Sequence, residues 1–179
     1  IPHSKEVNLM KLGVITVLFG DRPFDEALAY LKTLGIEELE VGAGGYPGKA
    51  HCDPAVLLAD DKKLKEFTDT VEKYGMKINA FGCHGNPVHP NAEIAKKYRD
   101  DWHNAVLLAE KLGIPYIRVF GNKFGDDREA ATRRVINGIG ELCDYAEGTG
   151  VSVLLEVHGD FCNEAALAPV ILGLDGKEN

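Results

Sequence analysis

The sequence predicts an α/β protein in which parallel β-strands alternate with α-helices. Glycine recurs about every 40 residues, at Gly35, Gly75, Gly113 and Gly150, each time between a helical pattern and an apolar strand. Glycine readily takes the left-handed conformation that ends a helix. The stretch that starts at Val151 is nearly unbroken in apolar character, as in a strand covered on both faces. Repeating β-α units of this length indicate helical crossovers and parallel strands.

Five β-α units are expected along the chain. The strands are predicted at residues 11–18, 38–41, 76–82, 116–120 and from 151 onward. The helices are predicted to start near Phe24, after a cap at Asp60 or Asp61, and at about residues 91, 127 and 163, ending near 34, 74, 112, 147 and 172. Leu34 and Ile94 are expected on buried helix faces. Residues 42–60 are expected to form a long loop, with a helical turn after Asp53-Pro54.

The loop segment 42–48 is the nearest match to a dinucleotide-binding G-x-G-x-x-G motif. Pro47 stands where the third glycine belongs, so a flexible rim loop is favoured over a phosphate cradle. Long loops after strands fit a (β/α)8 barrel of the TIM type better than an open doubly wound sheet.

Only about the first five β/α units of such a barrel are present in this chain. Barrels of this type typically need about 250 residues, whereas the chain has 179. Either the sequence is a fragment, or part of the chain is not included, or half-barrels pair between subunits as a homo-oligomer. Residues 1–10 are interpreted as a leader or a cloning remnant, and residues 11–179 as the N-terminal portion of a single barrel.

Composition narrows the function classes. The net charge of −8 argues against nucleic acid as the main partner. No segment is long and apolar enough for a membrane span or a secretory signal, so a cytoplasmic location and no membrane partner are expected. The four cysteines form no C-x-x-C pair, which favours reduced thiols over disulfides or structural zinc.

Glu156 is the leading candidate for chemistry. It lies near the end of the strand that starts at Val151, where a parallel α/β protein binds ligands. A carboxylate there loses hydration worth several kcal/mol unless a cation or hydrogen-bond donors replace it. His158 is the next residue on the same side. One carboxylate with imidazole nearby suits a divalent metal such as Mn, Mg, Zn or Co, although three or four ligands are needed.

Two further groups of polar residues accompany Glu156. Glu40 and Arg118 also lie near strand ends, and an internal ion pair that fixes the barrel is the favoured reading over catalysis. The loop 83–90 carries His84, Asn86 and His89, whose polar groups could bind substrate hydroxyls or move a proton. Function is favoured for His84, whereas turn chemistry and function are equally open for His89.

Two stretches resemble the xylose-isomerase-like TIM barrels, a superfamily of sugar-phosphate isomerases and epimerases that also contains AP endonucleases. They are Ile-Asn-Ala-Phe-Gly-Cys-His-Gly-Asn-Pro-Val-His-Pro at 78–90 and Leu-Leu-Glu-Val-His-Gly-Asp-Phe at 154–161. The resemblance implies that Glu156 is a divalent-metal ligand that can also move the proton, and that His84 contacts the sugar. It implies that the remaining ligands, an Asp, a His and a Glu, come from strands six to eight.

The resemblance also separates the branches of the superfamily. The endonucleases use an additional His after strand four, where this chain reads Val119-Phe120-Gly121-Asn122, so DNA chemistry is not expected. Asn122 lies at the expected catalytic rim and is a candidate substrate-binding residue.

The expected function is metal-dependent isomerisation or epimerisation of a small sugar or sugar phosphate through an enediolate. Glu156 and His84 are the expected catalytic residues, and His84, Asn86, His89, Asn122 and His158 the expected substrate-binding residues. Two alternatives remain: a polyol dehydratase using the same metal site, and a non-catalytic sugar-binding fragment in which Glu156 is structural.

Overall fold

The computed structural model describes residues 10–120, 127–158 and 164–177. Its centre is one parallel sheet of five strands in the order β1-β2-β3-β4-β5, so that consecutive strands are neighbours. The strands are β1 (Gly13–Ile15), β2 (Glu38–Gly45), β3 (Lys77–His84), β4 (Tyr116–Phe120) and β5 (Ser152–Glu156). Sequential parallel strands joined by helices match part of a TIM barrel, as predicted.

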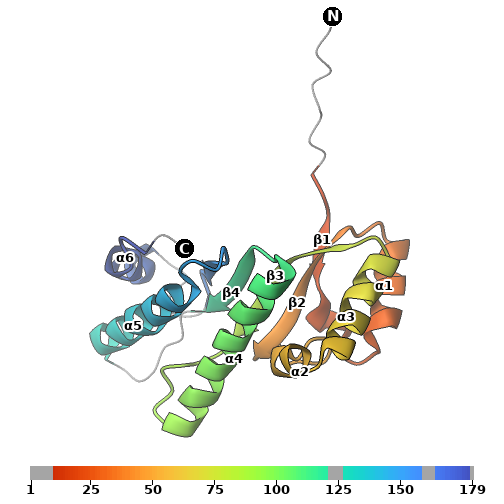
Figure 1. Cartoon of the computed structure of the whole chain (residues 1–179). Coiled ribbons are helices and arrows are strands. Elements are labelled where there is room, and N and C mark those ends of the chain that lie inside the picture. Colours follow the sequence, from red (N-terminus) through yellow and green to blue (C-terminus); the bar gives the residue numbers. More distant parts are fainter. Residues whose placement is uncertain (1–9, 121–126, 159–163, 178–179) are drawn as a thin grey trace, which may run out of the picture.

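Six α-helices accompany the sheet. They are α1 (Phe24–Thr33), α2 (Pro54–Ala59), α3 (Asp61–Lys73), α4 (Ala92–Leu112), α5 (Arg128–Ala146) and α6 (Glu164–Gly173). Figure 1 shows them in an arc beside the strands, with α1 and α3 at one end, α4 in the middle, and α5 and α6 at the other end. The short helix α2 confirms the helical turn expected after Asp53-Pro54.

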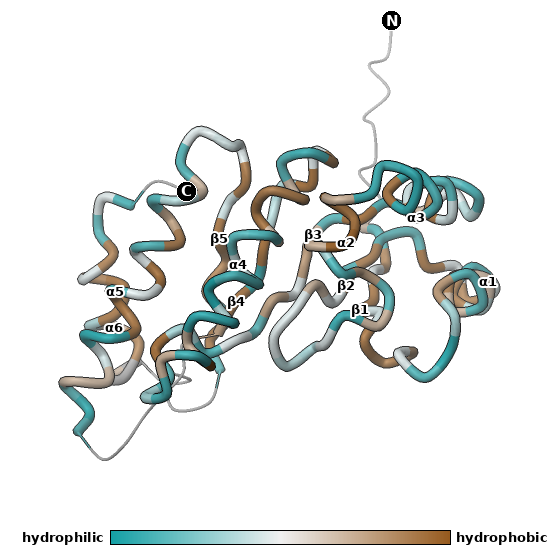
Figure 2. Tube along the Cα trace, turned by 60° about the horizontal axis from the view of Figure 1, so that its bottom comes forward, coloured by the Kyte–Doolittle hydropathy of each residue, from teal (hydrophilic) through white to brown (hydrophobic). Residues whose placement is uncertain are grey.

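Alternation along the strands separates a helix-facing side from an inner side. On β4, Ile117 and Val119 are fully buried in the core, whereas Arg118 and Phe120 between and beyond them are partly exposed. On β2, Leu39 and Val41 are fully buried, and Glu40 between them lies on the inner side. Strands β4 and β5 are hydrophobic in Figure 2, while the outer turns of α3 and α4 are hydrophilic. The core therefore lies between sheet and helices, and charged residues are left for the inner side.

The predicted glycine helix ends are confirmed for α1, α3 and α4, whereas α5 ends at Ala146 and Gly148 rather than Gly150 follows its C-cap, Glu147. Gly35, Gly75, Gly113 and Gly150 all have positive φ, between 61° and 76°. Of the two candidate caps for α3, Asp60 is the N-cap, and its side chain accepts hydrogen bonds from the backbone N–H groups of the first turn.

The predicted ends of three strands were wrong. Strand β3 does not end at Gly82 but runs to His84, which is therefore its last residue. The first strand spans only three residues, and Thr16–Phe19 continue as a 3-10 helix. The second strand does not end at Val41 but runs to Gly45, through two register shifts against β3. A Cβ on Gly45 would lie 2.2 Å from the carbonyl oxygen of His84, so glycine is what permits this extension to approach β3. The segment is neither a flexible loop nor a phosphate cradle at this point.

Two predicted core residues were also wrong. Leu34 is 54% exposed because it is the C-cap residue of α1, beyond its last packed turn. Ile94 is 39% exposed because Ala95 and Trp102 occupy the side of α4 that faces the sheet. Of the other expected core residues of α4, Ala105 and Leu108 are fully buried, whereas Tyr98 is only partly buried.

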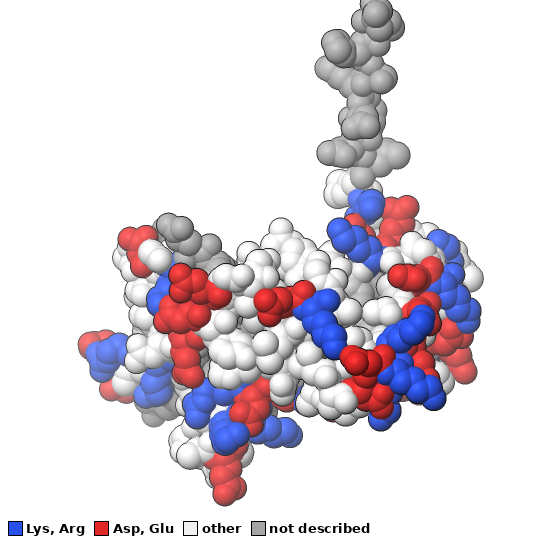
Figure 3. All heavy atoms as spheres, in the orientation of Figure 1, with Lys and Arg blue, Asp and Glu red and all other residues white. Residues whose placement is uncertain are grey.

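Charged side chains of both signs cover the outer surface. On the face shown in Figure 3, blue and red side chains alternate over the end that carries α1 and α3. Lys73 pairs there with Asp25, and Lys65 with Asp69. Within the ranges that the structure describes, no helix combines the length and apolar character of a membrane span. Cys52, Cys83 and Cys143 lie in buried positions.

Candidate functional site

The side chains of His84, Phe120 and Glu156 form a row across the carboxyl ends of β3, β4 and β5. Phe120 pairs in register with Glu156, and the ring of His84 stacks on that of Phe120 with centroids 3.6 Å apart. His158, two residues beyond Glu156, stacks on Phe120 with centroids 4.5 Å apart. The two imidazoles predicted from separate strands therefore lie near the same benzyl ring and the same carboxylate.

His84 is held in a buried, neutral state. Its side chain is 4% exposed, and its Nδ1 has no hydrogen-bond partner. Burial, together with the nearby Arg118 and His158, lowers the pKa of His84 to about 4. At neutral pH the imidazole therefore carries no charge and can both donate and accept a hydrogen bond.

The two carboxylate oxygens of Glu156 have different surroundings. Oε2 lies 3.2 Å from Nε of Arg118 and 3.8 Å from Nε2 of His84. It is buried, and although its distance to Arg118 is that of an ion pair, it accepts no hydrogen bond. Oε1 lies 4.0 Å from Nδ1 of His158. The closest approach of Arg118 to Glu156 joins Nε and Oε2, and neither atom has a hydrogen-bond partner, so the pair is not the hydrogen-bonded bidentate one that would occupy the whole carboxylate.

Arg118 also pairs with Glu40, as the sequence predicted. The Nη2 atom of Arg118 lies 2.8 Å from Oε1 of Glu40. These residues come from β4 and β2, which are separated by β3, and the contact crosses β3 at Gly82. A Cβ on Gly82 would lie 2.6 Å from Oε1 of Glu40. Burial raises the pKa of Glu40, and the negative charge of Glu156 adds to this, whereas Arg118 opposes it.

The loop after β3 is fixed by its neighbours. Asn86 is 2% exposed, and its Oδ1 accepts a hydrogen bond from the backbone N–H of Val88. His89 accepts a hydrogen bond from the backbone N–H of Asn91 through Nδ1, next to the start of α4. Arg99 of α4 donates to the carbonyl of Pro87. Asn86 and His89 thus serve turn geometry in this structure, and their predicted contacts with substrate remain predictions.

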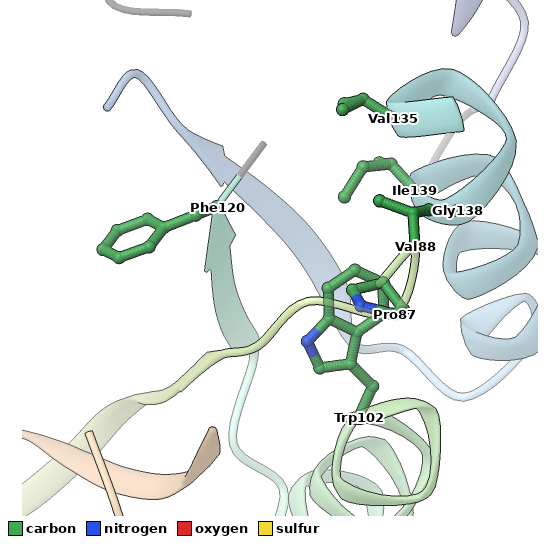
Figure 4. Close-up of a pocket in the computed structure, with 7 residues that line it drawn as sticks. All are labelled: Pro87, Val88, Trp102, Phe120, Val135, Gly138 and Ile139. Atoms are coloured by element: carbon green, nitrogen blue, oxygen red, sulfur yellow. The ribbon is translucent and has the colours of Figure 1, made fainter. Parts of the chain in front are cut away.

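Apolar packing supports the same loop from behind. Figure 4 shows Pro87 and Val88 beside Trp102 of α4 and close to Val135, Gly138 and Ile139 of α5, around a small apolar pocket. Phe120 borders this pocket but points its ring to the opposite side of β4. Trp102 donates its indole N–H to the carbonyl of Cys83 at 2.7 Å. The residue before His84 is therefore anchored by a buried hydrogen bond.

A clamp formed by Asp101 of α4 holds the extension of β2 through contacts with Gly45 and Lys49. Asp101 of α4 is 5% exposed, accepts from the backbone N–H of Gly45 at 3.2 Å, and pairs with Lys49 at 2.7 Å. Tyr46 follows directly, and its backbone N–H donates to the carbonyl of His84. Its ring contacts that of Tyr98, with centroids 5.7 Å apart. This clamp brings Tyr46 to the rim of the site.

A complete metal site is not formed by the described residues. No group of three or more His, Cys, Asp or Glu side chains within them could hold a metal ion. Glu156 supplies one carboxylate, with a buried oxygen that lacks a hydrogen bond and two imidazoles within about 4 Å. This donor fits a divalent ion as one ligand of several. Asn122 lies outside the described residues, so its predicted role is not tested.

Sequence reasoning missed Phe120 and Gly82. Phe120 alternates with Arg118 along β4, so the period-2 rule already placed both on the inner side. Gly82 precedes His84 by two residues and shares its side of β3 in the same way. The period of two residues along a strand could have placed both residues on the inner side, but neither phenylalanine nor glycine suggested chemistry.

The comparisons with known proteins agree with this geometry. A model of the Xylose isomerase-like TIM barrel family matches residues 28–178. The uncharacterized protein YfiH of Bacillus subtilis is 37% identical over 105 residues, which are 59% of this chain and 33% of YfiH. The chain thus spans only about a third of that relative.

Solved structures show the same fold. D-psicose 3-epimerase from Clostridium cellulolyticum, crystallised with D-tagatose, matches with a TM-score of 0.65 at 18% identity, over 93% of this chain and 60% of its own. The probable 3-DHS dehydratase AsbF from Bacillus anthracis matches with a TM-score of 0.67 at 16% identity, over 93% and 60%.

A protein from Mycobacterium smegmatis in complex with magnesium matches with a TM-score of 0.69 at 16% identity, over 92% of this chain and 61% of its own. At such identities these structures establish the fold and no more. The family match covers most of the chain and agrees with the five sequential parallel strands. The chain belongs to the xylose isomerase-like TIM barrel family.

Proposed function

We propose that this protein isomerises or epimerises a small sugar or sugar derivative with the help of a divalent metal ion. The observation that carries the proposal is the carboxylate of Glu156 at the carboxyl end of β5, between His84 and His158, with one buried oxygen that accepts no hydrogen bond. Ligands bind at this end of the strands in barrels of this family's architecture.

Glu156 would hold the metal together with ligands from outside the described residues. Carboxylate and imidazole donors suit Mn, Mg, Zn or Co, and the sequence does not choose among them. Structural neighbours have been crystallised with magnesium and with zinc, the latter in the IOLI protein and in TTHB071 of Thermus thermophilus. A bound divalent ion would supply positive charge that stabilises the negative charge developing on substrate oxygens.

The residues of this chain would bind the substrate and move its proton. Glu156 would take a proton from a carbon next to the sugar carbonyl through Oε1, the oxygen other than the buried Oε2. His84 is neutral because its pKa is lowered to about 4, so it would orient a sugar hydroxyl without repelling the metal. His158 is 61% exposed and would contact the substrate from the solvent side. Asn86, His89 and Asn122 are retained as further substrate-binding candidates.

The proposed substrate is a small sugar. Two D-psicose 3-epimerase neighbours were crystallised with D-tagatose and with D-fructose, which makes ketohexoses the first compounds to test. Sugar phosphates remain the second class to test. Nucleic acid is not proposed as a partner because the chain has a net charge of −8.

Exchange of substrate hydrogen tests the proposal directly. The intact protein is incubated with D-tagatose or D-fructose in D2O with Mn, Mg, Zn or Co, and NMR follows deuterium at the carbons beside the carbonyl. We expect deuterium incorporation and an isomer or epimer as product. Glu156→Gln should abolish both metal binding and exchange, whereas Glu141→Gln, on the exposed side of α5, should change neither. Full exchange activity in Glu156→Gln would refute the proposal.

Dehydration is the second candidate. It is favoured by the structural match to the probable dehydratase AsbF, which is as extensive as the match to the epimerase. The same metal and base could expel hydroxide after proton removal. Loss of water from a polyol substrate, seen by mass spectrometry of the product, would favour this candidate. A protein that binds sugar but binds no metal and catalyses no deuterium incorporation into the sugar would instead be a non-catalytic binder.

A further inference from the structure

Arg118 lies between two carboxylates that come from different strands. Its Nη2 pairs with Glu40 at 2.8 Å and its Nε pairs with Glu156 at 3.2 Å. The two contacts differ in their surroundings, because the side chain of Glu40 is 14% exposed and that of Glu156 is 31% exposed. The three side chains together carry a net charge of −1.

The sheet register places Arg118 one row below the proposed metal ligand. Arg118 pairs with Gly82 on one side and Leu154 on the other, whereas Glu156 pairs with Phe120 in the row nearer the strand ends. Gly82 has no side chain, which leaves the space through which Glu40 reaches the guanidinium. Arg118 is therefore anchored from below by Glu40 and approaches Glu156 from beneath, most closely through Nε.

We propose that Arg118 is a positioning residue that serves as the internal counterion of Glu156 and is exchanged for the divalent metal, while it keeps its ion pair with Glu40. The inference rests on the proposed metal site and adds a competitor for it. The contact to Glu156 is the weaker of the two, since it is longer and its carboxylate is more exposed to solvent, whereas the carboxylate oxygens on both sides of Arg118 lack a hydrogen bond. A divalent ion bound to Glu156 would repel the guanidinium and leave its other carboxylate partner in place.

The charges beside Glu156 predict whether each substitution raises or lowers the affinity for a divalent ion. Removing the guanidinium leaves two carboxylates and a net charge of −2, which attracts a divalent ion more strongly. A guanidinium about 5 Å from a divalent ion lowers affinity by about tenfold even at the dielectric constant of water, and by more in a protein interior. Removing Glu40 acts in the opposite direction, because Glu156 is then the one carboxylate partner that Arg118 keeps among the described residues, and Arg118 competes with the metal more strongly.

The experiment measures the dissociation constant for Mn²⁺ by calorimetry in the intact, metal-free protein at neutral pH. We expect Arg118→Gln to bind Mn²⁺ about tenfold or more tightly than wild type and Glu40→Gln to bind it more weakly. Arg118→Lys keeps the charge and should stay close to wild type. Arg133→Gln removes an exposed arginine of α5 as the matched control and should have no effect. A merely structural role of the ion pairs would weaken binding in both Arg118→Gln and Glu40→Gln.

The result separates this inference from the proposed function. If Glu156→Gln does not weaken Mn²⁺ binding, the metal site itself is wrong. If Glu156→Gln abolishes binding but Arg118→Gln binds no more tightly than wild type, only the exchange is refuted. Circular dichroism confirms folding of each variant, and if Arg118→Gln does not fold, the weaker binding expected of Glu40→Gln still tests the exchange, because unchanged or tighter binding there would overturn it.

Discussion

The absence of a side chain at Gly82 connects the stability of the barrel to the arrangement of the site. In Gly82→Ala the new Cβ would lie 2.6 Å from Oε1 of Glu40, well inside the contact distance of carbon and oxygen. The carboxylate of Glu40 must then move by close to 1 Å. Its 2.8 Å contact with Arg118 would be lost.

The size of the destabilisation follows from the burial of the ion pair between Glu40 and Arg118. Exposed ion pairs contribute less than about 1 kcal/mol, whereas breaking a buried pair costs about 3–5 kcal/mol. Glu40 is 14% exposed and Arg118 is 34% exposed, so the loss should lie between these limits, at about 1–3 kcal/mol. Alanine also gains about 0.5–1 kcal/mol over glycine through the lower entropy of the unfolded chain. We therefore expect a net destabilisation of about 0.5–2 kcal/mol.

The same substitution made in a variant that lacks the Glu40 carboxylate tests this explanation. In Glu40→Ala the clashing oxygen is absent, and the next contact of the new Cβ, Nε2 of His84 at 3.7 Å, is an ordinary one. Gly82→Ala should then be neutral or stabilising. The assay is urea unfolding of the intact protein followed by far-UV circular dichroism, for both single variants and the double variant. Equal destabilisation in both backgrounds would show that the penalty comes from the β3 backbone and not from the ion pair.

Three further predictions concern buried polar groups. Asp101→Asn should lower the free energy of unfolding by about 1–3 kcal/mol in urea titrations, because Lys49 loses its partly buried counterion. The pKa of His84 is lowered to about 4, below the value near 6.5 of the unfolded chain. Its contribution should therefore be complete above pH 6.5 and fall by up to about 3 kcal/mol as the pH of the metal-free protein drops to 4. His84→Gln should remove this slope. Burial raises the pKa of the Cys52 and Cys83 thiols, so both should react with a disulfide reagent only after unfolding.

Each of these three has a result that contradicts it. Unchanged unfolding of Asp101→Asn would mean that the clamp on the β2 extension contributes no stability. An acid slope that persists in His84→Gln would assign it to other groups. Rapid modification of Cys52 or Cys83 in the folded protein, identified by peptide mass spectrometry, would show that these positions are open to solvent.

Local signals were sufficient to predict the layout of the chain. The helix-ending glycines such as Gly113 act through backbone conformation alone, which does not depend on tertiary contacts. Strand β4 was predicted with its observed ends because it is a short apolar run between clear signals. The family follows from these units together with the two motif stretches.

Tertiary contacts decided what the sequence could not. The extension of β2 to Gly45 depends on hydrogen bonding to β3 and on the clamp from Asp101, which is 56 residues away in the chain. The exposure of Ile94 depends on which side of α4 meets the sheet at its first turn. Both follow from packing partners that a local pattern does not name.

The candidate site was likewise predicted from the sequence only in part. Position at strand ends brought Glu156 and His84 together as expected, and the ion pair between Glu40 and Arg118 formed as favoured. Phe120, which both imidazoles contact, was not predicted, because an aromatic residue at a strand end is as typical of a core as of a site.

The inner side of this sheet explains why such different residues act together. One row of paired residues consists of Gly42, Gly82, Arg118 and Leu154. Inner rows of these barrels must fill a limited volume. A Cβ on Gly82 would lie 2.6 Å from Oε1 of Glu40, so this glycine leaves the space in which Glu40 meets Arg118, whereas the space beside Gly42 is filled by Val17 and Pro47. The charge of Arg118 requires carboxylates, which Glu40 and Glu156 provide on its two sides. The packing of this row therefore places a cation directly beneath the proposed metal ligand, and a larger residue at Gly82 should alter the charge that the ligand experiences.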